Sequence, residues 1–307
     1  MPGLALKRLS RKPLFAIMAT VIIDFHTHIS SPQIRERQPQ YLGRDPIFTS
    51  LFSRPNTKMA SPEDVIASMD ECGVDISVIT NFGFSTMEMC QETNDYILES
   101  VARYPKRLVG FCTVQPKAGK AALTELERCL RGGAKGIGEM MPDRQGFDLD
   151  NEAIMGPIVD FAISHRLPFL THSSEPVGHQ YPGKGDVTPD KLFRFVTKFP
   201  QLTTVLAHWG GGLPFYALMP EVKQSLANAF VDTAASVFLY RAQVFSFVAD
   251  LIGADKILFA TDYPLISQSR LIQQVKSMNL PPQTEALIMG ENARKLLSLP
   301  ESTLAGG

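Results

Sequence analysis

Short apolar stretches rich in β-branched residues alternate with amphipathic stretches along most of the chain. Eight apolar stretches have the length and composition of buried strands, at 21–26, 75–80, 108–114, 135–139, 168–172, 203–208, 228–233 and 256–261. Helical periodicity separates many of them, at 61–73, 117–131, 152–166, 188–199, 236–252, 268–278 and 283–298. Strands that alternate with helices pair in parallel through right-handed crossovers. The pattern therefore predicts an α/β protein.

The simplest closure of eight such strands is a (β/α)8 TIM barrel, in which functional residues gather where the strands end. A doubly wound open sheet is the alternative, and it would place ligands at a switch point in the strand order. We expect residues 19–300 to form this single domain. Residues 1–18, with Lys7, Arg8, Arg11 and Lys12, are predicted to be a disordered N-terminal extension.

Five of the predicted strands end in a side chain that can bind a metal ion. The first strand ends in His26-Thr27-His28, and residues two apart on a strand point to the same face. Four later strands end in Glu139, His172, His208 and Asp262. Because the strand ends of a barrel share one face, we expect these side chains to form one site.

Imidazole nitrogens and a carboxylate oxygen are typical ligands of zinc and similar cations. We predict that His26, His28, His172 and Asp262 bind a divalent ion, with Zn²⁺ as the first candidate and Mn²⁺ as the second. Such an ion lowers the pKa of bound water to about 7, and Asp262 is the predicted general base. His208 is predicted to hydrogen-bond a substrate carbonyl or to carry a proton.

Two long segments without clear periodicity follow strands at the same face. Residues 29–60 are a candidate substrate lid, with a solvated insertion as the alternative, and residues 173–187 form the second segment. Three arginines near this face, Arg44, Arg54 and Arg241, are candidates for binding a substrate carboxylate, because the guanidinium group matches it in shape.

Several other polar and aromatic residues lie near the strand ends. Asp24 is expected to fix the start of the barrel or the tautomer of a histidine, and Asp232 is expected to support the ligands; neither is expected to bind metal. Trp209 either forms a wall of the pocket or packs in the core. His165 is expected outside the site, and His179 lies in a loop from which it can reach a substrate.

The composition limits the classes of binding partner that we expect for this protein. The net charge of −1 and the pI of about 6.6 give no reason to expect nucleic acid or an anionic membrane surface. No apolar run approaches the length of about 18 residues that a membrane span needs. The four cysteines form no CxxC pair, which indicates reduced thiols in the cytoplasm. The expected partner is a small molecule.

Motifs across the chain resemble the amidohydrolase superfamily. They are Asp24-Phe25-His26-Thr27-His28, His172, His208-Trp209-Gly210-Gly211, Thr261-Asp262-Tyr263-Pro264 and Glu291-Asn292-Ala293-Arg294-Lys295-Leu296-Leu297. The chain most resembles the amidohydrolase-related branch that includes aminocarboxymuconate semialdehyde decarboxylase. This resemblance implies a distorted TIM barrel, a divalent metal at the positions of His26, His28, His172 and Asp262, and a catalytic role for His208. Relatives of this kind often form homodimers.

Glu139 departs from both patterns that the resemblance offers. Many amidohydrolases carry a carboxylated lysine at this strand end, where it bridges two metals, and the decarboxylase branch commonly has no ligand there. A glutamate could bridge two cations, as in superfamily members that resemble the TatD nucleases. Alternatively, Glu139 orients a ligand histidine. The sequence therefore predicts that Glu139 contacts metal. It does not decide whether the centre holds one ion or two.

Three functions fit these residues. The leading hypothesis is a metal-dependent hydrolase in which activated water attacks an amide, lactone or ester carbonyl. The alternative is a metal-dependent decarboxylase or hydratase of a small carboxylic acid. The third is a catalytically silent barrel that keeps the ligands for structure or binding.

Overall fold

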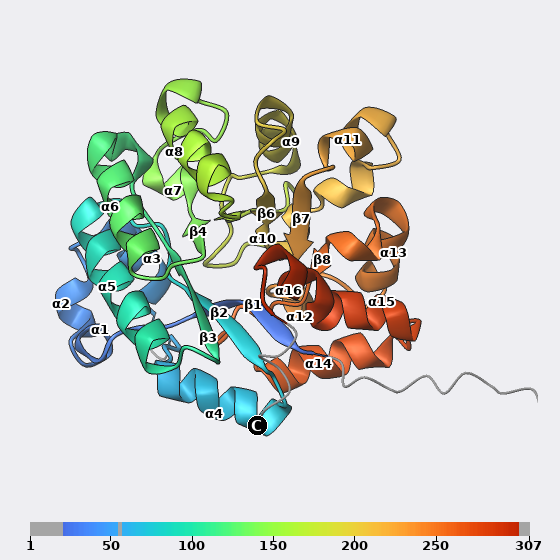
Figure 1. The fold of residues 1–307 in the computed structure, drawn as a ribbon, viewed down its shortest axis with the longest axis horizontal. Helices are drawn as coiled ribbons and strands as arrows, with labels where there is room; N and C mark the ends of the chain where they lie inside the picture. Colours follow the sequence, from blue (N-terminus) through green and yellow to red (C-terminus); the bar gives the residue numbers. More distant parts are fainter. Residues whose placement is uncertain (1–20, 55–56, 301–307) are drawn as a thin grey trace, which may run out of the picture.

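Eight parallel strands pair in chain order to form one sheet, β1-β2-β3-β4-β5-β6-β7-β8. The computed structural model describes residues 21–54 and 57–300 (Figure 1). The predicted extension, residues 1–18, lies outside this part of the chain. The strands are β1 (Ile23–His28), β2 (Ile76–Thr80), β3 (Leu108–Cys112), β4 (Gly136–Met140), β5 (Phe169–Thr171), β6 (Thr204–Leu206), β7 (Ala229–Asp232) and β8 (Ile257–Leu258).

Backbone hydrogen bonds between β1 and the segment that contains β8 bring the two ends of the sheet together. The N–H of Phe25 donates to the carbonyl of Phe259 (2.8 Å), and the N–H of Asp262 donates to the carbonyl of His26 (2.9 Å). The sheet is thus a nearly closed barrel. The predicted (β/α)8 TIM barrel is confirmed, and the open-sheet alternative is wrong because its edge strands would lie apart.

Helices surround the strands on the outside of the barrel (Figure 1). In chain order they are α1 (Pro32–Glu36), α2 (Gln38–Tyr41), α3 (Pro46–Phe52), α4 (Pro62–Cys72), α5 (Met87–Arg103), η1 (Pro116–Ala118), α6 (Lys120–Arg131), α7 (Pro142–Gln145), α8 (Glu152–His165), α9 (Pro189–Lys198), α10 (Ala207–Gly210), η2 (Leu213–Tyr216), α11 (Pro220–Ser225), α12 (Ser236–Leu239), α13 (Val244–Ile252), η3 (Ala254–Lys256), α14 (Gln268–Ser277), α15 (Pro282–Ala286), η4 (Leu287–Glu291) and α16 (Asn292–Leu296). None of the helices in the described part of the chain has the length and apolar character needed to cross a bilayer.

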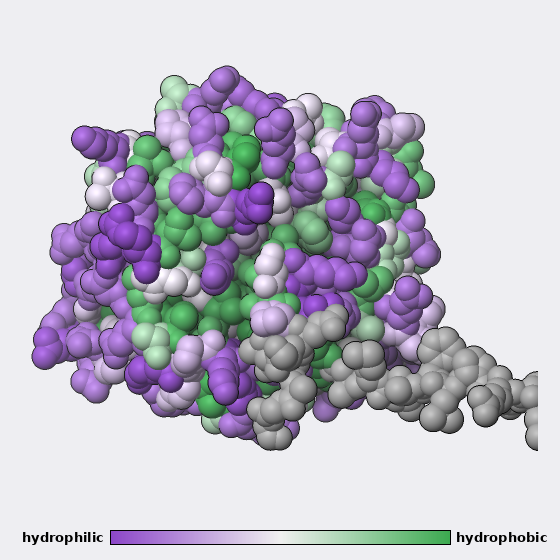
Figure 2. All heavy atoms as spheres, viewed as in Figure 1, coloured by the Kyte–Doolittle hydropathy of each residue, from purple (hydrophilic) through white to green (hydrophobic). Residues whose placement is uncertain are grey.

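The hydrophobic residues form two main layers. One cluster includes Phe25, Phe111 and Leu170 from the strands themselves, and a larger cluster packs the helices against the strands. Figure 2 shows hydrophilic residues around the outer edge of the helical ring and hydrophobic residues towards its middle. This is the arrangement expected when each helix buries one apolar face against the barrel.

Asp24 is a buried polar residue that closes the barrel. Its carboxylate accepts hydrogen bonds from the N–H and hydroxyl of Thr261 (2.9 and 2.7 Å) and from the side-chain amide of Gln268 on α14 (2.9 Å). These bonds join β1 to the residues that follow β8. Asp24 therefore supports the fold at the seam.

The segment 29–60 contains three short helices. They were not predicted, because the segment shows no clear hydrophobic periodicity. Each of α1, α2 and α3 has a proline in its first turn, and Asp45 caps α3 by accepting from the N–H groups of Ile47 and Phe48. Their apolar residues form a separate cluster with residues from the start of α5. Residues 32–52 form a helical insertion. Such short helices have too few turns to show a long hydrophobic period.

Helix α5 was also missing from the predicted elements. Its buried face mixes apolar Ile97 with polar Thr93, Asn94 and Ser100, which weakens the hydrophobic period. Asn94 is polar for a structural reason: its amide bonds both the N–H and the carbonyl of Thr113 (2.9 Å each). The helix is thereby fixed to the chain just beyond β3.

Candidate metal centre

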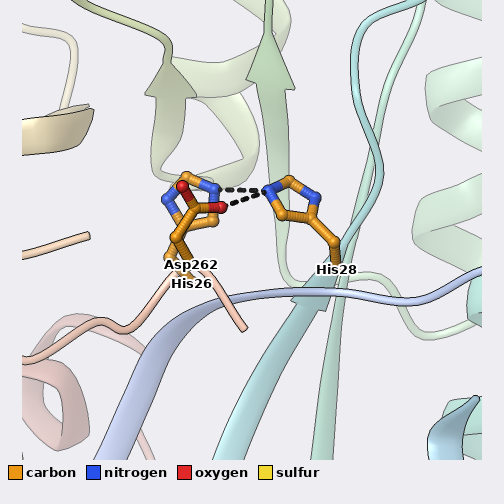
Figure 3. Close-up of side chains that lie close together, drawn as sticks. All are labelled: His26, His28 and Asp262. Atoms are coloured by element: carbon orange, nitrogen blue, oxygen red, sulfur yellow. Dashed lines mark hydrogen bonds and ion pairs between the residues drawn. The ribbon is translucent and has the colours of Figure 1, made fainter. Parts of the chain in front are cut away.

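The first group of candidate ligands joins the two ends of the sheet. His26 and His28 lie on β1, and Asp262 lies just after β8 (Figure 3). The Nε2 atoms of the two histidines are 3.0 Å apart, and Asp262 Oδ1 is 3.1 Å from Nε2 of His28. All three ligand atoms lie within 4.8 Å of one another. Two imidazole nitrogens and a carboxylate oxygen that converge in this way fit a divalent cation.

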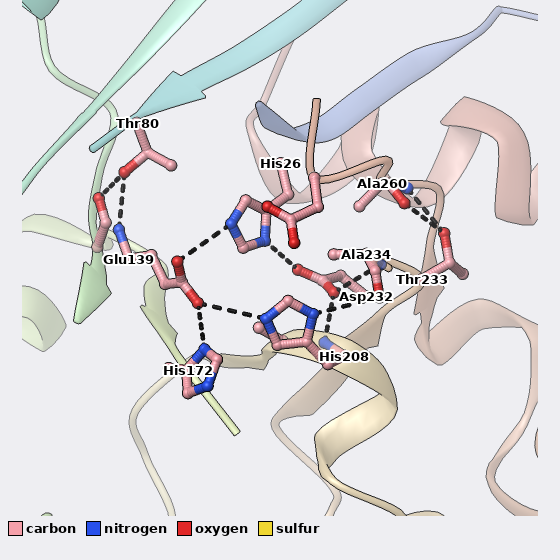
Figure 4. Close-up of polar contacts among 12 residues, drawn as sticks. His26, Thr80, Glu139, His172, His208, Asp232, Thr233, Ala234 and Ala260 are labelled. Atoms are coloured by element: carbon pink, nitrogen blue, oxygen red, sulfur yellow. Dashed lines mark hydrogen bonds and ion pairs between the residues drawn. The ribbon is translucent and has the colours of Figure 1, made fainter. Parts of the chain in front are cut away.

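The second group lies beside the first, around Glu139 on β4 (Figure 4). Oε1 of Glu139 is 2.8 Å from Nδ1 of His172, which follows β5, and 3.5 Å from Nε2 of His208, which follows β6. Its other oxygen, Oε2, lies 3.4 Å from Nε2 of His26 and 3.6 Å from Nε2 of His28. The structure thus places His172 with Glu139 and His208, whereas the sequence prediction placed His172 with His26, His28 and Asp262.

The ring nitrogens that face away from the centre have partners of their own. Nδ1 of His26 bonds Asp232 Oδ2 at 2.9 Å, and Nδ1 of His208 donates to the carbonyl of Ala234 at 3.2 Å. Nε2 of His172 is 3.2 Å from the hydroxyl of Ser174. Such outer bonds hold a histidine ring in place and leave the inner nitrogen for a cation. The support role expected of Asp232 agrees with this contact.

Burial and charge shift the pKa values of these groups in opposite directions. Burial alone would lower the pKa of His26, but the carboxylates of Glu139 and Asp232 hold it well above its usual value. Burial would raise the pKa of Glu139, but His26 and the bonds from His172 and His208 hold it well below its usual value. Burial alone would lower the pKa of His208, but the nearby carboxylates, chiefly Glu139, raise it to about 9. Asp262, next to His28, has a lowered pKa despite burial.

The backbone fixes the positions of Glu139, Asp262 and His208. The N–H of Glu139 donates to the hydroxyl of Thr80 (2.7 Å) and to the carbonyl of Asn81 (3.1 Å), so the end of β2 positions it. Asp262 and His208 adopt positive φ angles of 64° and 56°. Non-glycine residues in this left-handed region are uncommon and cluster at functional sites.

A cavity of about 670 Å³ opens over the centre, within the usual range for small-molecule sites. Its walls include His28, Glu139, His172, His208 and Asp262 together with Leu51, Phe52, Arg54, Met59, Phe82, Met141, His179, Tyr181, Phe238, Leu239 and Leu265. The ring of Phe82 stacks on the His28 ring, with centroids 4.0 Å apart and an angle of 15°. Sequence reasoning missed Phe82, although its position two residues beyond β2 marks it as a residue of the catalytic face.

The cavity contains only part of the predicted substrate-binding set. Arg54 and His179 line it. Arg44 instead pairs with Glu88 and Glu92 (3.0 Å each). Arg241 is not among the lining residues.

Two other aromatic predictions are settled by burial. Trp209 is fully buried, donates its indole N–H to Ser236 (3.0 Å) and packs edge-on against Phe245, so it belongs to the core. His165 lies at the end of α8, where its Nδ1 contacts the carbonyl of Phe161. It lies outside the centre, as expected.

Comparison with known proteins shows relatives along almost the whole chain. The 2-amino-3-carboxymuconate-6-semialdehyde decarboxylase of Dictyostelium discoideum is 23% identical over 336 residues, which covers 90% of this chain and 91% of that protein. Among solved structures, 5-carboxyvanillate decarboxylase from Sphingomonas paucimobilis superposes with a TM-score of 0.75 at 16% identity, covering 92% of this chain and 100% of the other. Dihydroxybenzoic acid decarboxylase from Polaromonas sp. JS666, with bound manganese and the inhibitor 2-nitroresorcinol, gives a TM-score of 0.70 at 21% identity, covering 94% and 100%.

These relatives overturn the leading functional hypothesis. The leading hypothesis was hydrolysis, in which activated water attacks an amide, lactone or ester carbonyl. All three relatives described above are instead decarboxylases. The hydrolase prediction is therefore wrong. It failed because the ligand residues specify a metal centre, whereas the reaction depends on the bound substrate.

The family itself follows from a match over most of the chain. Histidines and carboxylates at the ends of β1, β4, β5, β6 and β8 of a TIM barrel form a centre suited to a divalent metal. Residues 23–299 match the model of the amidohydrolase family Amidohydro_2. The chain belongs to this family and is an enzyme of the amidohydrolase superfamily.

Proposed function

We propose that this enzyme is a metal-dependent decarboxylase of a small carboxylic acid, with aromatic acids as the first candidate substrates. The observation that carries the proposal is the likeness to 2-amino-3-carboxymuconate-6-semialdehyde decarboxylase, which extends over nine-tenths of both chains. The TIM barrel and the cluster of ligand side chains beneath a cavity agree with it.

His26, His28 and Asp262 would hold the cation, because their ligand atoms converge and the outer nitrogen of His26 is already bonded to Asp232. A bound divalent cation supplies an electrophile that grips and polarises substrate oxygen atoms. Zinc and manganese both accept this ligand set. The manganese in the Polaromonas relative makes Mn²⁺ the first metal to test, ahead of the Zn²⁺ that the sequence favoured.

The cavity suits a flat substrate with a negative charge. Phe82, stacked on His28, presents an aromatic ring beside the ligands, and Phe52 packs edge-on against Phe82 with centroids 5.9 Å apart. Aromatic rings favour stacked or edge-on packing with other rings. Arg54 on the same cavity is proposed to pair with a carboxylate of the substrate.

Decarboxylation breaks the bond between the carboxyl carbon and the rest of the substrate, releases CO2 and leaves an electron pair on the other carbon. That carbon must then take a proton. Asp262 is the proposed carrier, because its carboxylate is part of the cavity wall and retains 14% exposure. Its lowered pKa keeps Asp262 ionised at neutral pH. The carboxylate would therefore first accept a proton from an acidic group of the substrate and then pass that proton to the carbon.

The test is CO2 release by protein loaded with Mn²⁺ or Zn²⁺ and supplied with 2,6-dihydroxybenzoate, 5-carboxyvanillate and related aromatic acids. We expect at least one acid to disappear with stoichiometric formation of CO2, and Asp262→Asn to lose at least ~100-fold in rate, a typical effect of removing an acid–base group. Removal of metal by a chelator should stop the reaction and re-addition should restore it. No CO2 from any acid by fully loaded protein would refute the proposal.

A further inference from the structure

We propose that the preferred substrate of this enzyme is an aromatic acid with a second aromatic ring, and that this second ring packs on an apolar wall at the mouth of the cavity. We call this surface the outer wall. It consists of Leu51 and Phe52 on α3, Phe238 and Leu239 on α12, and Leu265 after β8. The inference rests on the proposed decarboxylase function and names the substrate class of the same site.

The volume of the cavity exceeds what a single-ring acid needs. The cavity measures about 670 Å³, well within the range of about 300–1,000 Å³ for sites that bind drug-sized ligands. A single-ring acid such as 2,6-dihydroxybenzoate takes up about the space of five or six water molecules, roughly 150–180 Å³ at ~30 Å³ each. Such an acid would leave most of the cavity to water. The remaining space is large enough for a second ring.

The exposure of the lining side chains separates the base of the cavity from its mouth. His172 and Glu139 at the ligand centre are buried, whereas Phe238 and Leu265 are 47% and 49% exposed. Lining residues with so much exposed surface lie where the cavity meets the solvent. A ring that rests on Phe82 beside the ligands and a ring that rests on the outer wall are therefore at different depths of one cavity.

Three neighbouring strands of the barrel supply the outer wall. Helix α3 lies in the segment after β1, α12 follows β7, and Leu265 follows β8. β8 pairs with β7, and the segment that contains β8 bonds to β1. Because residues that follow neighbouring strands meet at the C-terminal face of a barrel, the five apolar side chains lie on one side of the mouth.

The aromatic residues of the cavity favour a ring as the second group of the substrate. Phe52 packs edge-on against Phe82, so the outer wall continues from the ring that stacks on His28. At the mouth, Phe238 is held by Arg270, whose guanidinium carbon lies 5.1 Å from the centroid of the phenylalanine ring. Aromatic rings favour offset or edge-on contact with other rings, and a ring that covers this wall releases water from apolar surface.

The polar side chains that also line the cavity do not exclude a second ring. Arg54, Lys58 and His179 are exposed, and the hydroxyl of Tyr181 donates to Glu175 (2.9 Å). These groups keep water or their protein partner when a ring covers the outer wall, so no polar group loses a hydrogen bond. A second carboxylate on the substrate would instead pair with the two cationic side chains, and the experiment tests this alternative.

The experiment compares how single-ring and two-ring compounds bind to the full chain loaded with Mn²⁺. The reference is 2-nitroresorcinol, the inhibitor bound to the Polaromonas relative, and the test compounds are its 4-phenyl, 5-phenyl and 5-carboxy derivatives. Isothermal titration calorimetry should give at least one phenyl derivative a Kd at least ~10-fold below that of the reference, as expected when a phenyl ring passes from water to an apolar surface. A smaller difference for both phenyl derivatives, or no binding, would overturn the inference. Tightest binding of the 5-carboxy derivative would also overturn it.

Two phenylalanine variants assign the contact to the outer wall. Phe238→Ala should reduce the preference for the phenyl derivative by ~2- to 10-fold, because one aromatic contact is lost. Phe247→Ala is the matched control and should keep the full preference, since Phe247 is 60% exposed on α13 and is not among the residues that line the cavity. An unchanged preference in Phe238→Ala, or an equal loss in Phe247→Ala, would count against the outer wall.

Binding and turnover separate this inference from the proposed reaction. If 2,6-dihydroxybenzoate releases CO2 but neither phenyl derivative binds more tightly than 2-nitroresorcinol, only the second ring is refuted. If a phenyl derivative binds more tightly but the corresponding phenyl-substituted acid and the single-ring acids release no CO2, only the proposed reaction is refuted.

Discussion

Asp232→Asn should weaken metal binding while the barrel remains folded. Asp232 is fully buried, and its two oxygens have separate tasks. Oδ2 accepts from Nδ1 of His26 (2.9 Å), and Oδ1 accepts from the N–H groups of His208 (2.8 Å) and Ala234 (3.1 Å). Asparagine can keep its amide oxygen towards the two N–H groups, and its NH2 group then faces His26. Because NH2 only donates, the His26 proton moves to Nε2, which is the atom that must bind the cation.

The magnitude follows from this role as a supporting residue. Loss of such a hydrogen bond to a ligand histidine typically weakens metal affinity about 10- to 100-fold, or roughly 1.4–2.7 kcal/mol. At a metal concentration of about 100 times the wild-type Kd, binding to one site stabilises the wild type by ~2.7 kcal/mol. A variant with 100-fold weaker binding gains only ~0.4 kcal/mol under the same conditions.

Competition with a chelator gives the Kd, and urea unfolding with and without Mn²⁺ gives the stabilisation by metal. Asp45→Asn is the matched control, because Asp45 is also buried but caps α3 and accepts from Ser85 away from the centre. We expect it to lower stability equally with and without metal. If Asp232→Asn binds Mn²⁺ as tightly as the wild type, the assigned role of the Asp232–His26 bond is refuted.

Three further predictions concern the cavity, the turn after α10 and the outer helices. Phe82→Ala should raise KM for an aromatic acid by ~2- to 10-fold, because an aromatic pair contributes about 0.5–1.5 kcal/mol; steady-state kinetics would contradict this if only kcat fell. Gly211→Ala should destabilise the protein by about 1–3 kcal/mol, because φ is 57° and a Cβ would overlap the carbonyl oxygen of Ser174; unchanged urea unfolding would contradict it. Glu125→Gln should cost about 1.5–3 kcal/mol at pH 7. Burial raises the pKa of Glu125, but hydrogen bonds, first that from Arg128, lower it below its usual value. The stability difference between wild type and variant should therefore be complete above pH ~4.5 and shrink as the pH falls further. A stability difference that does not change with pH in chelator-treated protein would contradict this prediction.

Strand order and the position of the ligands could be predicted from the sequence because both depend on local pattern. Parallel strands read as short apolar runs, and barrel topology places their ends on one face. His26, Glu139, His172, His208 and Asp262 accordingly come together as predicted from five strand ends. The boundaries were less accurate: β8 is only Ile257–Leu258, so Asp262 lies in the loop that follows it.

The grouping of the ligands could not be predicted, because it depends on ring rotation and loop geometry. Sequence spacing gives no reason for His172 to present Nδ1 or for His208 to adopt a positive φ. The contact of Phe82 with His28 likewise depends on the turn after β2. The reaction could not be predicted either, because the metal ligands shared by a superfamily support more than one kind of reaction.

The ligand arrangement also connects metal binding to closure of the barrel. The seam between β1 and β8 is short, with β8 only two residues long, and Asp24 and the backbone of Asp262 supply several of its bonds. A cation held by His26, His28 and Asp262 would link the two sides of this seam directly. Metal in this centre would therefore stabilise the barrel as well as act on the substrate, since ligands that bind only the folded state raise its stability.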